Sequence, residues 1–183
     1  MLSNKISNRL NFSLRFSGTP IESPETVSQH IAAMQLLALE LYNEFINRGL
    51  TFDIKDVMYR VTLHDLDEAA MGDIPTPIKY YDEKLYHEFE RVSQAELERN
   101  YNKEIVEACL NAKDRNSFEG LIVDLLDSVQ CINRLKISAS FSSRFNGMLF
   151  ESIDILSKKL STIELNDSRV PVLKDIISQE LTP

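Results

Sequence analysis

The segment Tyr59–Tyr81, YRVTLHDLDEAAMGDIPTPIKYY, gathers side chains that can bind a metal and move protons. An apolar, helix-like run ends at the adjacent pair His64 and Asp65, and Glu68 and Asp73 follow before a Pro-Thr-Pro turn. Imidazole nitrogens and carboxylate oxygens are common ligands of divalent metals, and carboxylates also serve as general bases. Adjacent residues of an α-helix point about 100° apart. We therefore expect the pair at a helix end, where both side chains can reach one metal.

A metal that performs hydrolysis needs about two protein ligands beyond His64 and Asp65. In a helical protein these come from other helices. His30 lies on the apolar helix that precedes the pair, and Asp127 lies on an apolar helix that follows it. This mixed set of nitrogen and oxygen donors suits Mn, Co, Fe, Ni, Zn or Mg, with open positions for water and substrate oxygens.

Each of these residues has a simpler interpretation when it is taken alone. A histidine beside an apolar stripe is most often a core residue whose hydrogen bonds are satisfied, and an aspartate on an apolar helix is most often a solvated or capping side chain. Taken alone, Glu68 would be interpreted as an exposed acid on a helix. Asp73 would be interpreted as a residue that forms a turn. His87 stands among charged residues and is expected at the surface. The case for a site rests on the combination.

Composition excludes several classes of function. The net charge of −8 over 183 residues argues against a surface for a nucleic-acid polymer, which requires clustered Lys and Arg. Cys109 and Cys131 form no CxxC pattern, so no disulfide framework or zinc knuckle is expected. The N-terminus lacks the apolar core of a signal peptide, and no stretch approaches a membrane span. We expect a cytoplasmic protein that is not bound to a membrane.

The spacing of apolar residues predicts an all-α fold. Glycine and proline are scarce, at 5 and 6 residues, and apolar side chains recur at intervals of three and four. No strand alternation or internal repeat interrupts this pattern. The second expected helix has Ser23 as its N-cap and Pro24 as its first residue, and it ends at Gly49. A long charged helix is expected from Ile78 to about Leu110, either continuous or interrupted. The other expected helices cover residues 1–14, Asp53 to His64, 117–138, 145–163 and 170–181.

The order His30, His64-Asp65, Asp127 resembles that of the HD-domain metal-dependent phosphohydrolases. Two longer segments narrow the resemblance. RFSGTPIESPETVSQH places an Arg-aromatic pair fifteen residues before the first histidine, and LHDLDEAAMGDIPTPIKYY is similar to the block HD-x-x-E-x-x-x-GD-x-PTP-x-K-Y. Both are similar to segments of the bacterial HD-domain 5'-deoxynucleotidases and of small phage HD-domain enzymes that hydrolyse deoxynucleoside triphosphates. The resemblance covers residues 10–135 approximately.

For the fold, the resemblance implies an HD-domain helical bundle that forms one domain over residues 1–183. Its core would cover about residues 10–140, and helices within 141–183 would complete it. The resemblance also implies one divalent metal ion bound by four ligands, namely His30, His64, Asp65 and Asp127. Enzymes of this type assemble as dimers or larger rings, so a homo-oligomer is expected.

The same resemblance assigns roles to acids near the metal. It implies that Glu68 orients or deprotonates the attacking water, which its position four residues after His64 on a helix would permit. It implies that Asp73 assists catalysis or holds sugar and phosphate groups.

The resemblance further implies a set of substrate contacts. Arg15 matches a phosphate-binding arginine, whose planar fork suits phosphoryl oxygens. Phe16 stands where the family often has Trp and would pack against sugar or base, with Gly18 close to the base. Thr76 and Lys79 match the PTP-x-K motif of the family, and Lys79 is a candidate for a second cation that contacts the substrate.

Two positions depart from the family pattern. Gln29 stands where Glu often precedes the first histidine, a change of little expected consequence. Asp124 stands three residues before the last ligand, where a phosphate-binding Lys is frequent, and it is also a rival to Asp127 as metal ligand. We prefer Asp127 as the metal ligand because the segment LLDSVQC fits the AD-x-L motif of the family better than the segment LIVDLLD does.

The resemblance leaves three functions open. The first choice is hydrolysis of deoxynucleoside 5'-monophosphates to nucleoside and phosphate. The alternative is a deoxynucleoside triphosphate triphosphohydrolase, which would use the same ligands but release triphosphate. The loss of a cation at Asp124 weighs slightly against this alternative. A catalytically silent, nucleotide-binding helical domain is the third, and the presence of all four ligands and Glu68 argues against it.

Overall fold

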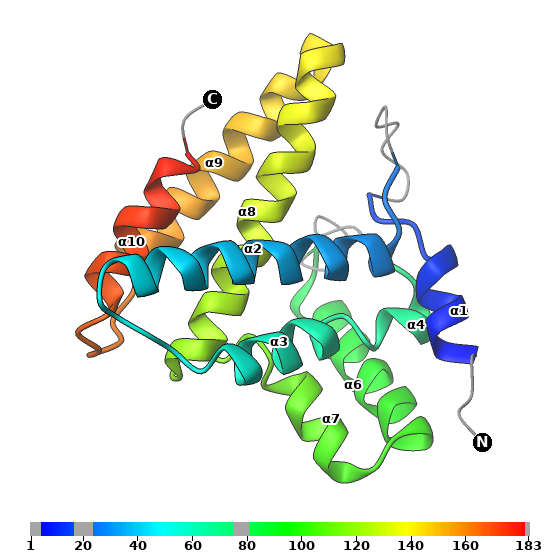
Figure 1. Ribbon diagram of the computed structural model, residues 1–183. Coiled ribbons are helices and arrows are strands. Elements are labelled where there is room, and N and C mark those ends of the chain that lie inside the picture. The colour runs from blue at the N-terminus through cyan, green and yellow to red at the C-terminus, as the bar shows by residue number, and fades with distance from the viewer. Residues whose placement is uncertain (1–4, 17–23, 75–80, 182–183) are drawn as a thin grey trace. The chain divides into compact units, whose positions relative to one another are not determined.

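The computed structural model describes residues 5–16, 24–74 and 81–181 of the chain (Figure 1). Within these ranges the regular elements are helices, and the isolated β-bridge between Leu14 and Thr26 is their single β-type pairing. The all-α prediction is confirmed. The elements are α1 (Lys5–Phe12), α2 (Val27–Asn47), α3 (Ile54–Leu63), α4 (Glu68–Met71), α6 (Glu83–Asn100), α7 (Lys103–Leu110), α8 (Phe118–Phe141), the 3-10 helix η1 (Ser143–Phe145), α9 (Asn146–Ser161) and α10 (Val170–Gln179).

The chain divides into two compact units. The first unit takes residues 1–32 and 62–112, and the second unit takes residues 33–61 and 113–183. The expectation of a single domain over 1–183 stays a prediction. Among the described residues, no helix has the length and apolarity needed to cross a membrane.

The first unit buries an apolar cluster where its helices meet. In this unit α4 packs against α1 and α6, and α6 packs against α7. Burial of such side chains stabilises the fold by about 1.5–3 kcal/mol for each large aliphatic residue. The buried members of the cluster are Leu10, Val27, Leu63, Leu66, Leu97, Val106 and Cys109.

The second unit is built around α8. Helices α9 and α10 both pack against α8 (Figure 1). Near the start of α8 the ring of Phe45 meets the rings of Phe52 and Phe118 edge to face, and Phe52 and Phe118 are tilted relative to each other. The apolar stripe predicted for this helix is confirmed, because Phe118, Leu121, Ile122, Leu125, Val129, Ile132 and Leu135 are all buried.

The start of α2 differs from the prediction. Pro24 and Glu25 precede the helix, which begins at Val27, and Ser23 lies outside the described residues. The segment before Val27 is held extended by its pairing with the residues after α1: the Arg15 N–H donates to the Glu25 carbonyl over 2.8 Å. The helix therefore starts later than the Ser-Pro-Glu sequence predicts, because residues 24–26 pair with a distant segment of the chain.

Thr26 caps α2 in place of Ser23. Thr26 N–H donates to Gln29 Oε1 over 2.9 Å, and Gln29 N–H donates to Thr26 Oγ1 over 3.2 Å. This reciprocal pair is a capping box of the T-x-x-Q type. The shift of the start places His30 in the first turn of α2 rather than in its second.

The long charged helix is interrupted and begins later than predicted. Asp82 caps α6 by accepting the N–H groups of Lys84 and Leu85, so Tyr81 and Asp82 precede the helix. Residues 78–80 lie outside the described ranges. Asn102 caps α7 by accepting the Ile105 N–H, and it separates α7 from α6. The other helices lie close to their predicted places, with Gly49 at a φ of +72° just beyond the end of α2.

Replacement of Gly120 by alanine is expected to destabilise the protein by about 1–3 kcal/mol, the usual cost of overpacking. A Cβ at Gly120 would overlap the backbone oxygen of Asp114 and lie 2.8 Å from Ser117 Oγ. Gly147 on α9 is the matched control, because a Cβ added there would meet no atom within 4 Å and alanine suits a helix. Urea unfolding of both variants tests this, and equal midpoints would contradict it.

Candidate metal centre

His64 and Asp65 stand in the turn that follows α3. The helix ends at Leu63, and the turn is closed by the Leu66 N–H, which donates to the Leu63 carbonyl. The Glu68 N–H then donates to the Asp65 carbonyl as α4 begins. The prediction that the adjacent pair stands at a helix end is confirmed, and the turn frees both side chains from helical spacing.

Three ligand atoms converge in the first unit. His30 Nε2 lies 3.1 Å from His64 Nε2 and 3.5 Å from Asp65 Oδ2, and His64 Nε2 lies 3.0 Å from the same carboxylate oxygen. All three side chains are buried, the two imidazoles completely. Among the described residues, this is the group of His, Cys, Asp or Glu side chains whose ligand atoms are close enough to hold one ion.

The distances between these atoms fit a divalent metal ion. With metal–ligand distances of about 2.0–2.2 Å, two neighbouring ligands of an octahedral or tetrahedral ion lie about 2.8–3.6 Å apart. The separations of 3.0–3.5 Å among the three atoms fall within this interval. A mixed nitrogen and oxygen set of this kind suits first-row transition metals. The geometry thus supports a metal ion at His30, His64 and Asp65.

Arg15 brings a cation beside the three ligands. Its Nη1 donates to Asp65 Oδ2 over 3.0 Å, and its side chain is 14% exposed. The backbone of Arg15 is held by the bridge that joins Leu14 to Thr26. A guanidinium in this position can contact an anion bound at the metal centre.

Glu68, the first residue of α4, places a carboxylate in the same region. Its Oε2 is buried and has no hydrogen-bond partner among the described residues. Burial, and then the negative charges of Asp65 and Asp73, raise the pKa of Glu68 to about 9, against an opposing effect of Arg15. A buried acceptor without a partner is costly. A nearby cation would relieve this cost, so Glu68 is a second indication that a metal belongs here.

Asp73 is hydrogen-bonded to the backbone of Phe16, the residue after Arg15. Its Oδ2 accepts the backbone N–H of Phe16 over 2.7 Å. Phe16 has a φ of +58°, a left-handed conformation that is rare for an aromatic residue. The structure therefore brings Arg15, Phe16, Glu68 and Asp73 together in the first unit. The remaining predicted substrate contacts, Gly18, Thr76 and Lys79, lie outside the described residues.

The two rival aspartates of α8 belong to the second unit and have different partners. Asp124 Oδ2 accepts from Arg115 Nε over 2.7 Å, and Asp124 Oδ1 accepts from Lys159 Nζ over 2.8 Å. Both of its oxygens are thus bound by cations of its own unit. Asp127 Oδ2 accepts from Lys113 Nζ over 2.7 Å. The contacts of Asp124 favour a structural role for it, and ligation by Asp127 stays a prediction.

Sequence reasoning missed the partners of Asp124. Lys159 is 35 residues away on α9, and no local pattern links it to α8. The capping box of Thr26 and Gln29 was also missed, although its T-x-x-Q signal is visible in the sequence. His87 is exposed, as predicted.

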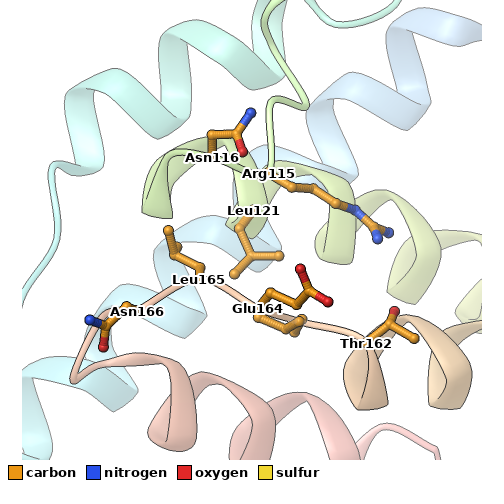
Figure 2. A pocket seen from close by; sticks show the side chains of 8 residues that line it. Arg115, Asn116, Leu121, Thr162, Glu164, Leu165 and Asn166 are labelled. Carbon is orange, nitrogen blue, oxygen red and sulfur yellow. The ribbon is translucent and has the colours of Figure 1, made fainter.

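The second unit also holds a cavity of about 450 Å³ at the start of α8. Figure 2 shows its labelled side chains, which come from the segment before α8, from α8 itself and from the segment after α9. Its lining residues are Arg115, Asn116, Leu121, Thr162, Ile163, Glu164, Leu165 and Asn166. Among the described residues it gathers no set of three metal-binding side chains, so the metal centre remains the candidate site.

Known proteins share both the sequence pattern and the fold. Residues 5–140 match the family model of the YfbR-like 5'-deoxynucleotidases. The 5'-deoxynucleotidase VP0926 of Vibrio parahaemolyticus is 32% identical over 77 residues, which make up 40% of this chain and 38% of that relative. The chain thus matches well under half the length of this curated relative.

Two solved structures resemble the chain over nearly its whole length. A conserved hypothetical protein from Pyrococcus furiosus has a TM-score of 0.75 at 21% identity. The aligned region covers 96% of this chain and 95% of the Pyrococcus chain. An HD-domain phosphohydrolase from Listeria innocua has a TM-score of 0.68 at 18% identity, with 97% and 96% covered. The predicted HD-domain fold is confirmed. With residues 5–140 matched to the family model, the chain belongs to the YfbR-like 5'-deoxynucleotidase family.

Proposed function

We propose that the protein is a metal-dependent phosphohydrolase that converts deoxynucleoside 5'-monophosphates to nucleoside and phosphate. The observation that carries the proposal is the convergence of His30 Nε2, His64 Nε2 and Asp65 Oδ2 within 3.5 Å of one another. The description of the matching family and the name of the relative from Vibrio parahaemolyticus both point to deoxynucleotides as substrates.

In this proposal one divalent ion is held by His30, His64 and Asp65, with Asp127 as the predicted fourth ligand. The identity of the ion is one of Co, Mn, Zn, Ni, Fe and Mg. When bound, such an ion polarises a phosphoryl oxygen and lowers the pKa of a water molecule.

The residues around the metal centre have separate roles. The Arg15 guanidinium, which already donates to Asp65, would also donate to phosphoryl oxygens and offset the charge that develops on them. Glu68 would accept the proton of the attacking water at its buried Oε2, which has no competing hydrogen bond among the described residues.

Recognition of the nucleoside is assigned to Phe16 and to three further predicted contacts. The Phe16 ring, next to Arg15, would pack against sugar or base. Gly18, Thr76 and Lys79 keep the substrate-binding roles that the resemblance implies. A homo-oligomeric assembly and a cytoplasmic location also remain predictions.

Product analysis tests the proposal. The protein is incubated with dAMP, AMP and dATP, each with Mn²⁺, Co²⁺ or Mg²⁺, and the products are resolved by mass. We expect deoxyadenosine and phosphate from dAMP, and a slower reaction with AMP. Release of triphosphate from dATP without action on dAMP would overturn the assignment in favour of a triphosphohydrolase.

Substitution of the two α8 aspartates decides which of them is a ligand. Asp127→Ala is expected to weaken Co²⁺ binding by about 100-fold or more, since loss of a direct ligand exceeds the 10–100-fold effect of an outer partner. Asp124→Ala is expected to keep Co²⁺ affinity but to lower stability by about 1–3 kcal/mol, because Arg115 and Lys159 lose their partner. Cobalt titration and urea unfolding measure the two effects. The reverse pattern would make Asp124 the ligand.

A further inference from the structure

One side-chain hydrogen bond connects the turn after α3 with α6. The Ser93 hydroxyl donates to Asp67 Oδ2 over 2.6 Å, and the two residues are 26 positions apart. Asp67 stands between Asp65 and Glu68 and directly precedes α4. The acceptor is a carboxyl group, and hydrogen bonds to ionised acceptors are shorter and stronger than neutral ones. The contact therefore reaches the middle of the turn from a distant part of the chain.

Ser93 occupies a position on α6 that suits an apolar residue. The buried residues of α6 are Ser93 and Leu97, which stand four positions apart and so share one face of the helix. Leu97 belongs to the buried apolar cluster of the first unit, as does Leu66, the neighbour of Asp67. A hydroxyl group buried at such a position is costly unless it is hydrogen-bonded. Asp67 supplies the acceptor that Ser93 needs.

Asp67 uses its side chain for this contact instead of capping α4. An aspartate directly before a helix usually accepts an N–H of the first turn. Here the Asp67 backbone is already helical, with a φ of −65° and a ψ of −27°, and its side chain makes no capping bond in the described part of the chain. The carboxyl group accepts from Ser93, so it fastens the turn to α6.

The turn is held by long hydrogen bonds of its own. The Glu68 N–H donates to the Asp65 carbonyl over 3.2 Å, and the Ala69 N–H donates to the Leu66 carbonyl over 3.3 Å. Both distances are at or beyond the upper end of the usual range. Helix α4 has four residues, far fewer than a helix needs to be stable alone. Contacts from other helices must therefore fix the places of Asp65 and Glu68.

We propose that Ser93 is a positioning residue of the metal centre: through Asp67 it fixes the turn, and thereby keeps Asp65 directed at the metal and Glu68 directed at the attacking water. The inference rests on the proposed function, in which Asp65 is a ligand and Glu68 accepts a proton. In this role Ser93 acts through the Asp67 carboxyl group and contacts neither metal nor substrate.

Cobalt titration of four proteins tests whether Ser93 acts through Asp67. The proteins are the wild type, Ser93→Ala, Asp67→Ala and the double variant. Ser93→Ala is expected to weaken Co²⁺ binding by about tenfold, the lower end of the effect of a partner outside the ligand set. In the Asp67→Ala background the same substitution is expected to change the affinity by less than about twofold, because its partner is already gone. A loss of the same size in both backgrounds, or no loss in either, would overturn the proposal.

Two further variants separate positioning from a general loss of stability. Ser93→Thr keeps a hydroxyl group and is expected to bind Co²⁺ within about threefold of the wild type. Asn102→Ala is the matched control, because it removes the cap of α7 in the same unit and costs about 0.5–2 kcal/mol without touching the turn. It should keep wild-type Co²⁺ affinity. A loss in either variant as large as that in Ser93→Ala would overturn the proposal.

Hydrogen exchange tests the contact without metal or substrate. In ¹⁵N-labelled, EDTA-treated protein, the amides of Glu68 and Ala69 are expected to exchange about 10–100-fold faster in Ser93→Ala than in the wild type, the loss that follows from one hydrogen bond to a charged group. The Leu173 amide on α10, which donates to the Arg169 carbonyl, is the internal reference and should not change. Unchanged exchange at Glu68 and Ala69 in Ser93→Ala would overturn the proposal.

These measurements also separate the inference from the proposed function. A wild-type protein that hydrolyses no deoxynucleoside monophosphate would overturn the function. Cobalt affinity and amide exchange would still decide the role of Ser93, because neither measurement requires substrate.

Discussion

Replacement of His64 by alanine is expected to lower kcat/KM toward dAMP by about 10³-fold or more and to abolish Co²⁺ binding at stoichiometric concentration. A metal that polarises a phosphoryl group contributes several kcal/mol to transition-state stabilisation, and each 1.36 kcal/mol is a factor of ten. His64 Nε2 lies within 3.1 Å of both His30 Nε2 and Asp65 Oδ2. Loss of its imidazole therefore removes the donor that adjoins both other ligands.

His87→Ala is the matched control for this experiment. The chain has three histidines, and the His87 side chain is 65% exposed on α6, whereas the side chains of the other two are buried beside Asp65. It should keep wild-type activity and cobalt stoichiometry. Because His64→Ala also creates a cavity, His64→Gln serves as a second variant of similar size, with circular dichroism as the check on folding. Full activity in both His64 variants would contradict the proposed metal centre.

Replacement of Glu68 by glutamine is expected to lower kcat by about 10²–10⁴-fold, the usual contribution of a positioned general base. The amide cannot accept the proton of water, yet it has nearly the same size as the carboxyl group. Metal affinity should change far less than in His64→Ala, because Glu68 is not among the three converging ligands. Rapid-quench measurement of kcat with dAMP, together with cobalt titration, checks both statements.

The same substitution should alter the pH dependence of stability in the metal-free protein. The pKa of Glu68 is raised from 4.5 to about 9 by burial and by Asp65 and Asp73. A raised carboxyl pKa favours the folded state fully below pH 4.5, and this contribution is lost as pH rises toward 9. The wild type should therefore lose up to about 1.4 kcal/mol per pH unit relative to Glu68→Gln in this interval.

Urea unfolding in EDTA at pH 5, 7 and 9 measures this difference. Glu68→Gln should be the more stable protein at pH 9, and the two proteins should converge at pH 5. Glu83→Gln is the control, since the Glu83 side chain is 90% exposed on α6. Parallel pH curves for the wild type and Glu68→Gln would show that Glu68 ionises normally in the metal-free protein and would contradict the raised pKa.

Elements defined by local patterns were predictable. The stripe of α8 follows from spacing alone, because apolar residues at intervals of three and four must share one face. The end of α3 before His64 was predictable for another reason: adjacent helical side chains point about 100° apart, so the His64-Asp65 pair can reach one metal only at a helix end. The start of α2 was not, because the Ser-Pro-Glu signal at 23–25 competes with the pairing of Leu14 with Thr26, which arises only when distant segments meet. The Asp82 cap, by contrast, was a local signal that the long charged pattern concealed.

The candidate site divides in the same way. The residue types and the helix end at His64-Asp65 indicated a metal, but the distance of His30 from the pair depends on packing in the first unit. The bond from Phe16 to Asp73 spans 57 residues and requires a left-handed aromatic residue, which no sequence rule would select. The spacing of Glu68 from His64 is also typical of an exposed helix acid, so the sequence alone could not assign its role. The assignment depends on the burial of its Oε2 in the structure.

The central claim is that a divalent ion bound at His30, His64 and Asp65 is required for phosphate release. The most direct measurement is a titration of EDTA-treated protein with Co²⁺ or Mn²⁺, in which phosphate release from dAMP is followed at each addition. The account predicts no release after chelation and full recovery at about one equivalent of metal per chain. Phosphate release that persists undiminished after chelation, with no metal bound, would contradict the account.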